Sequence, residues 1–200
     1  MIQGSDIALL NAWQNFYILI GTAAATLTGL MFVATTLIAG LDRHASTLHA
    51  GVSAFSSPTV VHFCAVLLLA GILSAPWQAF STLGFVLGLL GIGMVLYLLS
   101  VMRQMWKVPQ YQTPLKDWLW YMVLPLAAYA AVIVAAFALP ANPALALYMV
   151  SAAMAALLFL GVHNAWDLVT YLAIQRSHTD NPNSEPAHSG SSRRHNRPSR

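Results

Sequence analysis

Long, nearly uninterrupted runs of apolar residues, separated by short polar segments, form the dominant pattern along this chain. An α-helix needs about 20 residues to cross the ~30 Å hydrocarbon core of a bilayer. Each run is apolar almost all round, and none alternates apolar with polar residues as a barrel strand does, so helices are the expected backbone. We therefore predict an all-α fold, a polytopic transmembrane helical bundle with five spanning helices, at residues 16–39, 59–75, 82–102, 118–139 and 144–170.

Short connections marked by proline separate the second run from the third, at 76–81, and the fourth from the fifth, at 140–143. Connections of this kind suit helices that lie antiparallel to each other. The last run stays compatible with a helix to about Ile174, which is longer than the hydrocarbon core requires, so we expect this helix to tilt or to protrude. Pro125 lies inside the fourth run, and we expect it to kink that helix.

The predicted transmembrane domain covers residues 1–176, and a tail follows at 177–200. The tail is rich in Ser, Pro, Asn and His, so it cannot bury a core, and we predict a disordered basic segment on the cytoplasmic side. Its arginines either contact anionic lipid or are simply solvated. Segment 41–57 has no clear pattern, and a short helix lying on the inner membrane surface is one interpretation.

The amino-acid composition supports the same class of protein. Apolar types make up 58% of the chain and charged types only 8%, against roughly 45–50% and about 25% in an average soluble domain. This balance excludes an ordinary soluble enzyme, a disordered protein and a nucleic-acid-binding domain, and it makes the lipid bilayer the expected partner. The single cysteine, Cys64, excludes an intramolecular disulfide and a metal site built from cysteines.

The positions of the basic residues predict how the chain is threaded. With five spans, all nine Lys and Arg residues fall in the first loop, in or beside the third loop, or after the last span, and those three regions share one side of the membrane. Basic residues near spanning helices mark the cytoplasmic side. We therefore predict an N-terminus outside and a C-terminus inside. The N-terminus has no basic region ahead of an apolar one, so we do not expect a cleaved signal peptide.

Two stretches carry a family resemblance. They are NFYILIGTAAATLTGLMFVA at 15–34 and SPTVVHF at 57–63, together about a sixth of the chain. These stretches resemble small bacterial multi-pass inner-membrane proteins to which no activity is assigned. The resemblance implies a helical bundle in the inner membrane and no particular chemistry.

A few polar residues at membrane depth are the candidates for a functional site. Ionisable groups in this environment are costly, so they suggest a function. His62 lies one turn into the second span, and His163 lies near the inner end of the fifth, so both histidines are expected at similar heights. Asp167 follows His163 by one turn on the same helix face. The full candidate cluster comprises His62, Arg103, Tyr121, His163, Asn164 and Asp167.

This cluster allows several interpretations. Two histidines and a carboxylate can bind a transition metal, which makes His62, His163 and Asp167 weak candidates for a metal site. The same groups can relay a proton or form the mouth of an ion path. The alternative is a purely structural role, in which segment 163–171 already leaves the membrane and Asp167 only orients His163. We expect no bound cofactor.

Small residues at four-residue spacing form a helix-packing stripe in the first span and a second one in the third. Such stripes let helix backbones approach closely. They act either within one chain or between copies of it, so a homo-oligomer is a further candidate. The residues are Gly21, Ala25, Gly29, Gly84 and Gly88.

No Gly-x-Ser-x-Gly motif, phosphate-binding loop or dinucleotide fingerprint occurs in the sequence. We therefore expect a membrane protein without catalytic activity, either a structural or interaction component or a small channel or transporter. The alternative is a metal- or haem-binding redox or proton-relay module that uses the intramembrane histidines.

Overall fold

The computed structural model describes residues 4–41, 46–105 and 118–179, and the regular elements in this part of the chain are all helices. This confirms the all-α prediction. The chain divides into two units, residues 1–168 and residues 169–200, and the second unit contains the end of the last helix. The elements in order are α1 (Gly4–Leu41), α2 (Ser46–Ser74), α3 (Phe80–Met105), η1 (Leu119–Val123), α5 (Leu124–Ala138) and α6 (Pro143–Thr179).

Four helical stretches are long and apolar enough to cross a membrane: Ala8–Thr36, Phe80–Arg103, Leu119–Ala138 and Pro143–Asp167. The apolar part of α2, Pro58–Ser74, is shorter. The structure therefore supports four membrane-spanning helices, and the fifth span stays a prediction. The last helix contains 37 residues, which corresponds to about 55 Å, so the expected excess over the hydrocarbon core is confirmed.

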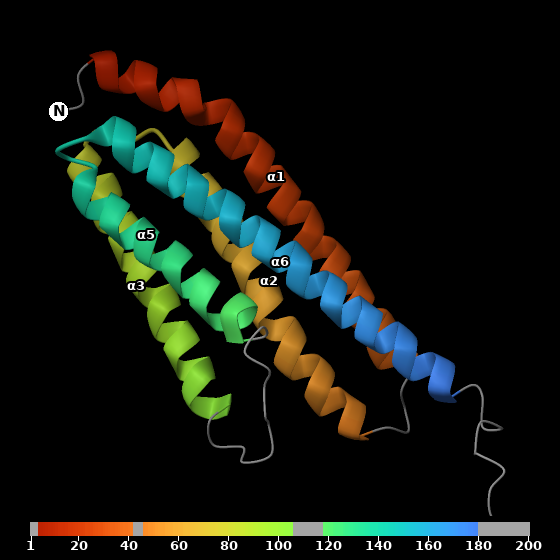
Figure 1. The fold of residues 1–200 in the computed structure, drawn as a ribbon. Helices are drawn as coiled ribbons and strands as arrows, with labels where there is room; N and C mark the ends of the chain where they lie inside the picture. The colour runs from red at the N-terminus through yellow and green to blue at the C-terminus, as the bar shows by residue number, and fades with distance from the viewer. Residues whose placement is uncertain (1–3, 42–45, 106–117, 180–200) are drawn as a thin grey trace, which may run out of the picture. The chain divides into compact units, whose positions relative to one another are not determined.

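Within the first unit, consecutive helices run in opposite directions and pack as neighbours (Figure 1). α1 lies against α2, and α3 lies against the η1–α5 helix. α6 contacts α1 through the rings of Trp13 and Tyr148, whose centroids are 4.7 Å apart, and it contacts α2 where Phe63 meets Gly161. Buried Leu, Val, Ala and Met side chains from these helices form one core.

Local sequence explains where the helices begin and end. α6 starts at Pro143, because proline fits the first helical position and the preceding Asn142 accepts a hydrogen bond from the Leu145 N–H at 3.2 Å. At the end of α2, the Ile72 carbonyl accepts hydrogen bonds from the Ala75 N–H and from the indole N–H of Trp77, which helps to close the last turn. Both connections are short, as predicted.

Pro125 changes the fourth helix in a specific way. The helix opens with a π-turn, η1, in which the Leu124 N–H donates to the Leu119 carbonyl, and Pro125 stands in the first turn of α5 directly after it. Proline has no N–H to donate and crowds the carbonyl four residues before it, so a wider turn relieves the clash.

Two expectations concern segments near the gaps in the described chain. From Ser46 onward, the segment predicted as a surface helix is the beginning of α2 and continues into the apolar part without a break. α6 extends to Thr179, and the rest of the predicted tail, 180–200, lies outside the described residues.

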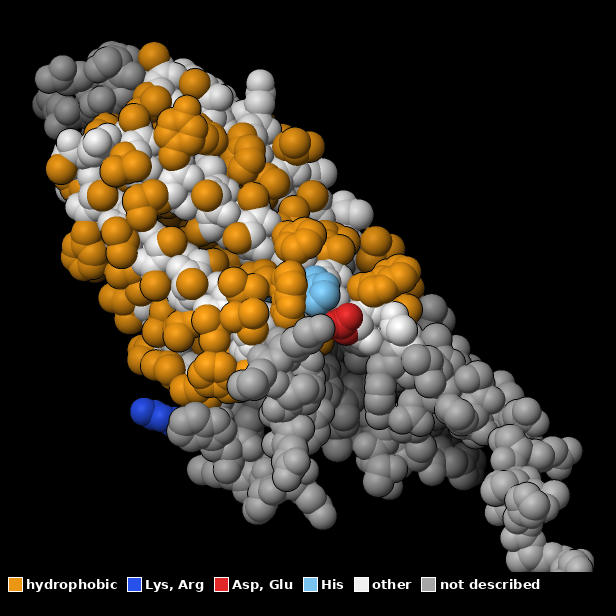
Figure 2. Space-filling view, viewed as in Figure 1, with side chains coloured by type: hydrophobic (Ala, Val, Ile, Leu, Met, Phe, Trp, Pro, Cys, Tyr) orange, Lys and Arg blue, Asp and Glu red, His pale blue; other side chains and the backbone are white. Residues whose placement is uncertain are grey.

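The surface of the first unit is apolar over a large area. Phe32, Phe85 and Phe137 are each at least 70% exposed, and hydrophobic side chains cover most of the face seen in Figure 2, whereas the charged and histidine side chains visible there gather toward one end. Soluble monomeric proteins rarely expose so large a continuous apolar surface. These helices are suited to contact lipid.

Candidate functional site

His62 lies in the interior of the first unit. Its side chain is fully buried on the face of α2 that also carries Thr59, Val66 and Leu69, which recur at three- and four-residue spacing. The ring Nδ1 lies 2.8 Å from the hydroxyl of Tyr129 on α5, a hydrogen bond between two fully buried side chains. The second ring nitrogen, Nε2, has no hydrogen-bond partner among the described residues.

Asn164 is the second buried polar group in this region. It is 1% exposed, and neither its amide nitrogen nor its amide oxygen has a hydrogen-bond partner in the described part of the chain. It follows Gly161 by three residues, so it lies on the same side of α6 as the contact between Gly161 and Phe63. We call His62, Tyr129 and Asn164 the buried centre.

His163 and Asp167 lie at the surface. The His163 Nε2 is 3.5 Å from an Asp167 carboxylate oxygen, and their side chains are 34% and 48% exposed. The Trp120 ring of η1 covers the imidazole, with ring centroids 4.0 Å apart and an interplanar angle of 34°. We call Trp120, His163 and Asp167 the exposed cluster.

The structure thus divides the predicted cluster into two groups. The spacing of His163 and Asp167 brings that pair together. No hydrogen bond, ion pair or ring contact among the described residues joins His62 to the pair. Arg103 is exposed near the end of α3 and forms no ion pair with another described residue, and Tyr121 is half-buried in η1.

A metal site receives no geometric support from the described residues. Among them, no group of three His, Cys, Asp or Glu side chains is close enough to hold an ion. Of the three weak candidates, His163 and Asp167 are paired, whereas the Nδ1 of His62 is already bound to Tyr129.

Two partners of the histidines were missed by the sequence reasoning. Tyr129 lies in the middle of an apolar run, and Trp120 was not among the candidate site residues. Two further buried polar residues were missed as well: Tyr17 of α1 and Ser151 of α6 are both buried, and neither hydroxyl has a hydrogen-bond partner among the described residues. No signal in the sequence pairs residues so far apart in the chain.

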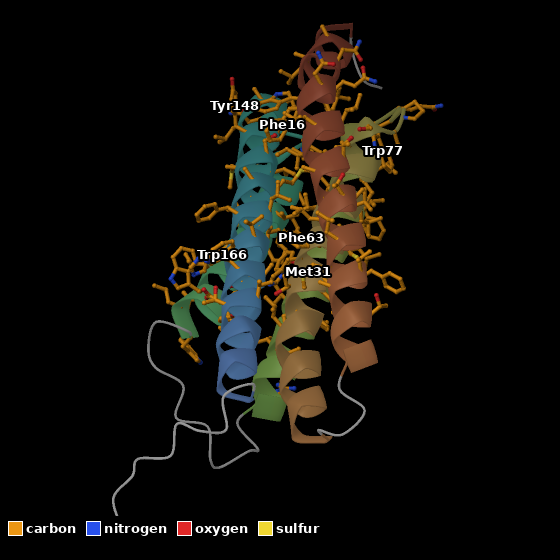
Figure 3. The ribbon with its side chains drawn as sticks, turned by 90° about the vertical axis from the view of Figure 1, so that its right-hand side faces the viewer. Phe16, Met31, Phe63, Trp77, Tyr148 and Trp166 are labelled. Atoms are coloured by element: carbon orange, nitrogen blue, oxygen red, sulfur yellow. The ribbon has the colours of Figure 1, made fainter. Side chains whose placement is uncertain are left out.

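Several aromatic side chains of the first unit gather near one end of its helices. Figure 3 shows Phe16, Tyr148 and Trp77 near that end, whereas Phe63 and Trp166 lie further along the helices at similar heights. Trp13 connects the first group, because its ring contacts Phe16 and Tyr148.

The packing stripes have different surroundings. A Cβ atom added at Gly84 would lie 2.6 Å from the Ala136 carbonyl oxygen, and one at Gly88 would lie 3.6 Å from the Ala136 Cβ, so the α3 stripe packs against α5. In α1, a Cβ at Gly21 would lie 2.8 Å from the Ala70 Cβ of α2. Ala25 is exposed, and no atom lies within 4 Å of a Cβ built on Gly29.

The fold and its apolar surface together define an all-helical membrane protein. Comparison with known proteins adds no family: the chain matches no protein-family model, no curated protein and no solved structure.

Proposed function

We propose that the protein crosses the bacterial inner membrane five times, with its N-terminus outside and its C-terminus in the cytoplasm. The distribution of basic residues supports this count. If α2 did not span, Arg43 and the basic residues between α3 and η1 would lie on opposite sides of the membrane. With α2 as a span, all nine basic residues lie on one side, as cytoplasmic segments require.

Reporter fusions test this threading. A reporter that works only in the cytoplasm should be active when it is fused after Arg200. A tag placed before Ile2 should be accessible from the periplasm. A reporter that finds the C-terminus in the periplasm would contradict both the orientation and the number of spans.

Within that membrane, we assign the protein a non-enzymatic role as an interaction component that acts through helix–helix contact, including contact with a second copy. The observation that carries this proposal is the difference between the two packing stripes. The α3 stripe is covered by α5, whereas in α1 Ala25 is exposed and a Cβ built on Gly29 would meet no neighbouring atom of the described residues within 4 Å. Small residues left open on a spanning helix permit a partner helix to approach closely.

Cysteine cross-linking in native membranes tests the contact with a second copy. The native thiol, Cys64, is exposed, so Cys64→Ser provides the background. Ala25→Cys or Gly29→Cys should then form a disulfide-linked dimer under mild oxidation. Leu30→Cys, which is also exposed but points to another side of α1, is the matched control and should stay monomeric. Equal cross-linking at 25, 29 and 30 would contradict a specific contact.

A second candidate function is the passage of protons or small ions, and the burial of His62 favours it. A buried histidine at membrane depth can take part in a proton relay. Purified protein in liposomes should then show proton flux that His62→Phe removes. Flux that is equal in both proteins, or absent from both, would leave the interaction role as the better description.

The metal- or haem-binding alternative has less support, because the described residues bring together no set of three ligands. An absorption spectrum and a metal analysis of the purified protein test it directly. A Soret band or stoichiometric metal would restore that alternative.

A further inference from the structure

The buried centre contains polar atoms that the protein itself does not pair. Five buried side-chain atoms lack a hydrogen-bond partner among the described residues, and three of them belong to His62 and Asn164. Buried polar atoms in folded proteins are nearly always paired, and each exception calls for a specific explanation, such as a bound water molecule. In the hydrocarbon region of a membrane, an unpaired polar atom is still more costly, because no bulk water is there to pair with it.

The packing of α2 against α6 places these two residues at one level. Phe63, the residue after His62, contacts Gly161, and Asn164 lies three residues further along α6. α2 and α6 run in opposite directions (Figure 1). The axial positions of His62 and Asn164 therefore differ by no more than about one helical turn, roughly 5 Å. Both side chains are on buried faces of their helices.

The chemistry of the unpaired atoms identifies the class of ligand. The bond between the His62 Nδ1 and the Tyr129 hydroxyl leaves the Nε2 as a donor in one tautomer and as an acceptor in the other. The Asn164 amide offers both a donor and an acceptor. A water molecule donates and accepts, so it can bridge the two side chains in either tautomer. A metal ion would leave the amide nitrogen unpaired.

We propose that at least one water molecule is held between α2, α5 and α6, where it bridges the His62 Nε2 to the Asn164 amide. This hydration site goes beyond the proposed interaction role and does not depend on it. The water molecule connects α2 to α6, and the hydrogen bond between His62 and Tyr129 adds α5 to the same network. It also explains why a buried asparagine is compatible with a core that is otherwise mainly apolar.

Solid-state NMR on the full chain in lipid bilayers tests the proposal without any mutation. The protein is labelled with ¹⁵N-histidine, and magnetisation is transferred from water to the imidazole nitrogens. His62→Phe identifies the His62 signals by their loss. His163, whose side chain is 34% exposed, is measured in the same sample for comparison. We expect transfer to the His62 Nε2 in the wild-type protein. Transfer to His163 but none to His62 would overturn the proposal.

Variants of Asn164 test the second end of the bridge. Asn164→Leu should reduce the transfer to His62 at least twofold, whereas Asn164→Ser, which keeps a polar group and leaves more room, should retain it. Val162→Leu, at an exposed position of the same helix, is the matched control and should change nothing. Unchanged transfer in Asn164→Leu, or a direct His62–Asn164 hydrogen bond without water contact, would show that the bridge is wrong. If a variant does not fold, the wild-type measurement still decides.

Discussion

His62 and His163 are expected at similar depths in their membrane spans, but the structure places them in opposite environments. Each lies in a helix that is apolar almost all round, and each is expected near the inner end of its span. His62 is fully buried and bonded to Tyr129, whereas His163 is about one-third exposed, stacked on Trp120 and paired with Asp167. The depth of a residue along its helix therefore does not predict whether the residue is buried. The direction in which the residue points around the helix decides its environment.

The energetic consequences differ as well. The hydrogen bond in the buried centre is shielded from solvent, and removing one partner leaves the other with an unmet desolvation cost of about 1–3 kcal/mol. The contact between His163 and Asp167 in the exposed cluster involves two substantially exposed side chains, and even a charged pair at an exposed position contributes only about 0–1 kcal/mol. Mutations in the two groups should therefore separate clearly in thermal stability.

The largest effect is expected at Gly161, which fixes the contact between α6 and the residue next to His62. A Cβ here would lie 2.9 Å from the Cζ of the fully buried Phe63 ring. Gly161→Leu should therefore destabilise the protein by about 3 kcal/mol, in the upper part of the range for overpacked cores. Thermal unfolding in detergent measures this effect, with Val162→Leu as the exposed control on the same helix. Equal stability of the two variants would show that α2 and α6 do not pack as described.

An intermediate effect is expected at the hydrogen bond of the buried centre. His62→Leu should cost about 2 kcal/mol, because it leaves the Tyr129 hydroxyl buried without a partner. Tyr129→Phe leaves the His62 nitrogen unpaired and should cost a similar amount. The double variant should be less destabilised than the sum of the two single variants, because neither member of this hydrogen bond is then left without the other. Simple additivity in this double-mutant cycle would contradict the hydrogen bond.

The smallest effect is expected in the exposed cluster. His163→Leu and Asp167→Asn should each change the free energy of unfolding by at most about 1 kcal/mol, since both side chains are substantially exposed. Their coupling energy in a double-mutant cycle should be about 0.5 kcal/mol or less and should fall as salt is added. A coupling energy as large as that of His62 and Tyr129 would remove the distinction between the two groups.

The sequence by itself determined the class of protein and the course of its helices. Run length, apolar composition and proline-marked connections are local properties, and in a bilayer they leave the backbone little choice other than a helix. They located every described helix. They also placed Asp167 one turn after His163, and pairs at this spacing meet on the same helix without help from the fold.

Only the tertiary structure decided which polar groups are buried and which glycines are covered. Helices that are apolar all round have no polar face to show which side points inward, so the sequence could not separate His62 from His163. The burial of His62 depends on Tyr129, which lies 67 residues away on α5. In the same way, Gly84 is covered because α5 packs there, while a Cβ built on Gly29 of α1 would meet no neighbouring atom of the described residues within 4 Å. These contacts join parts of the chain that are far apart in the sequence, so a local sequence pattern cannot predict them.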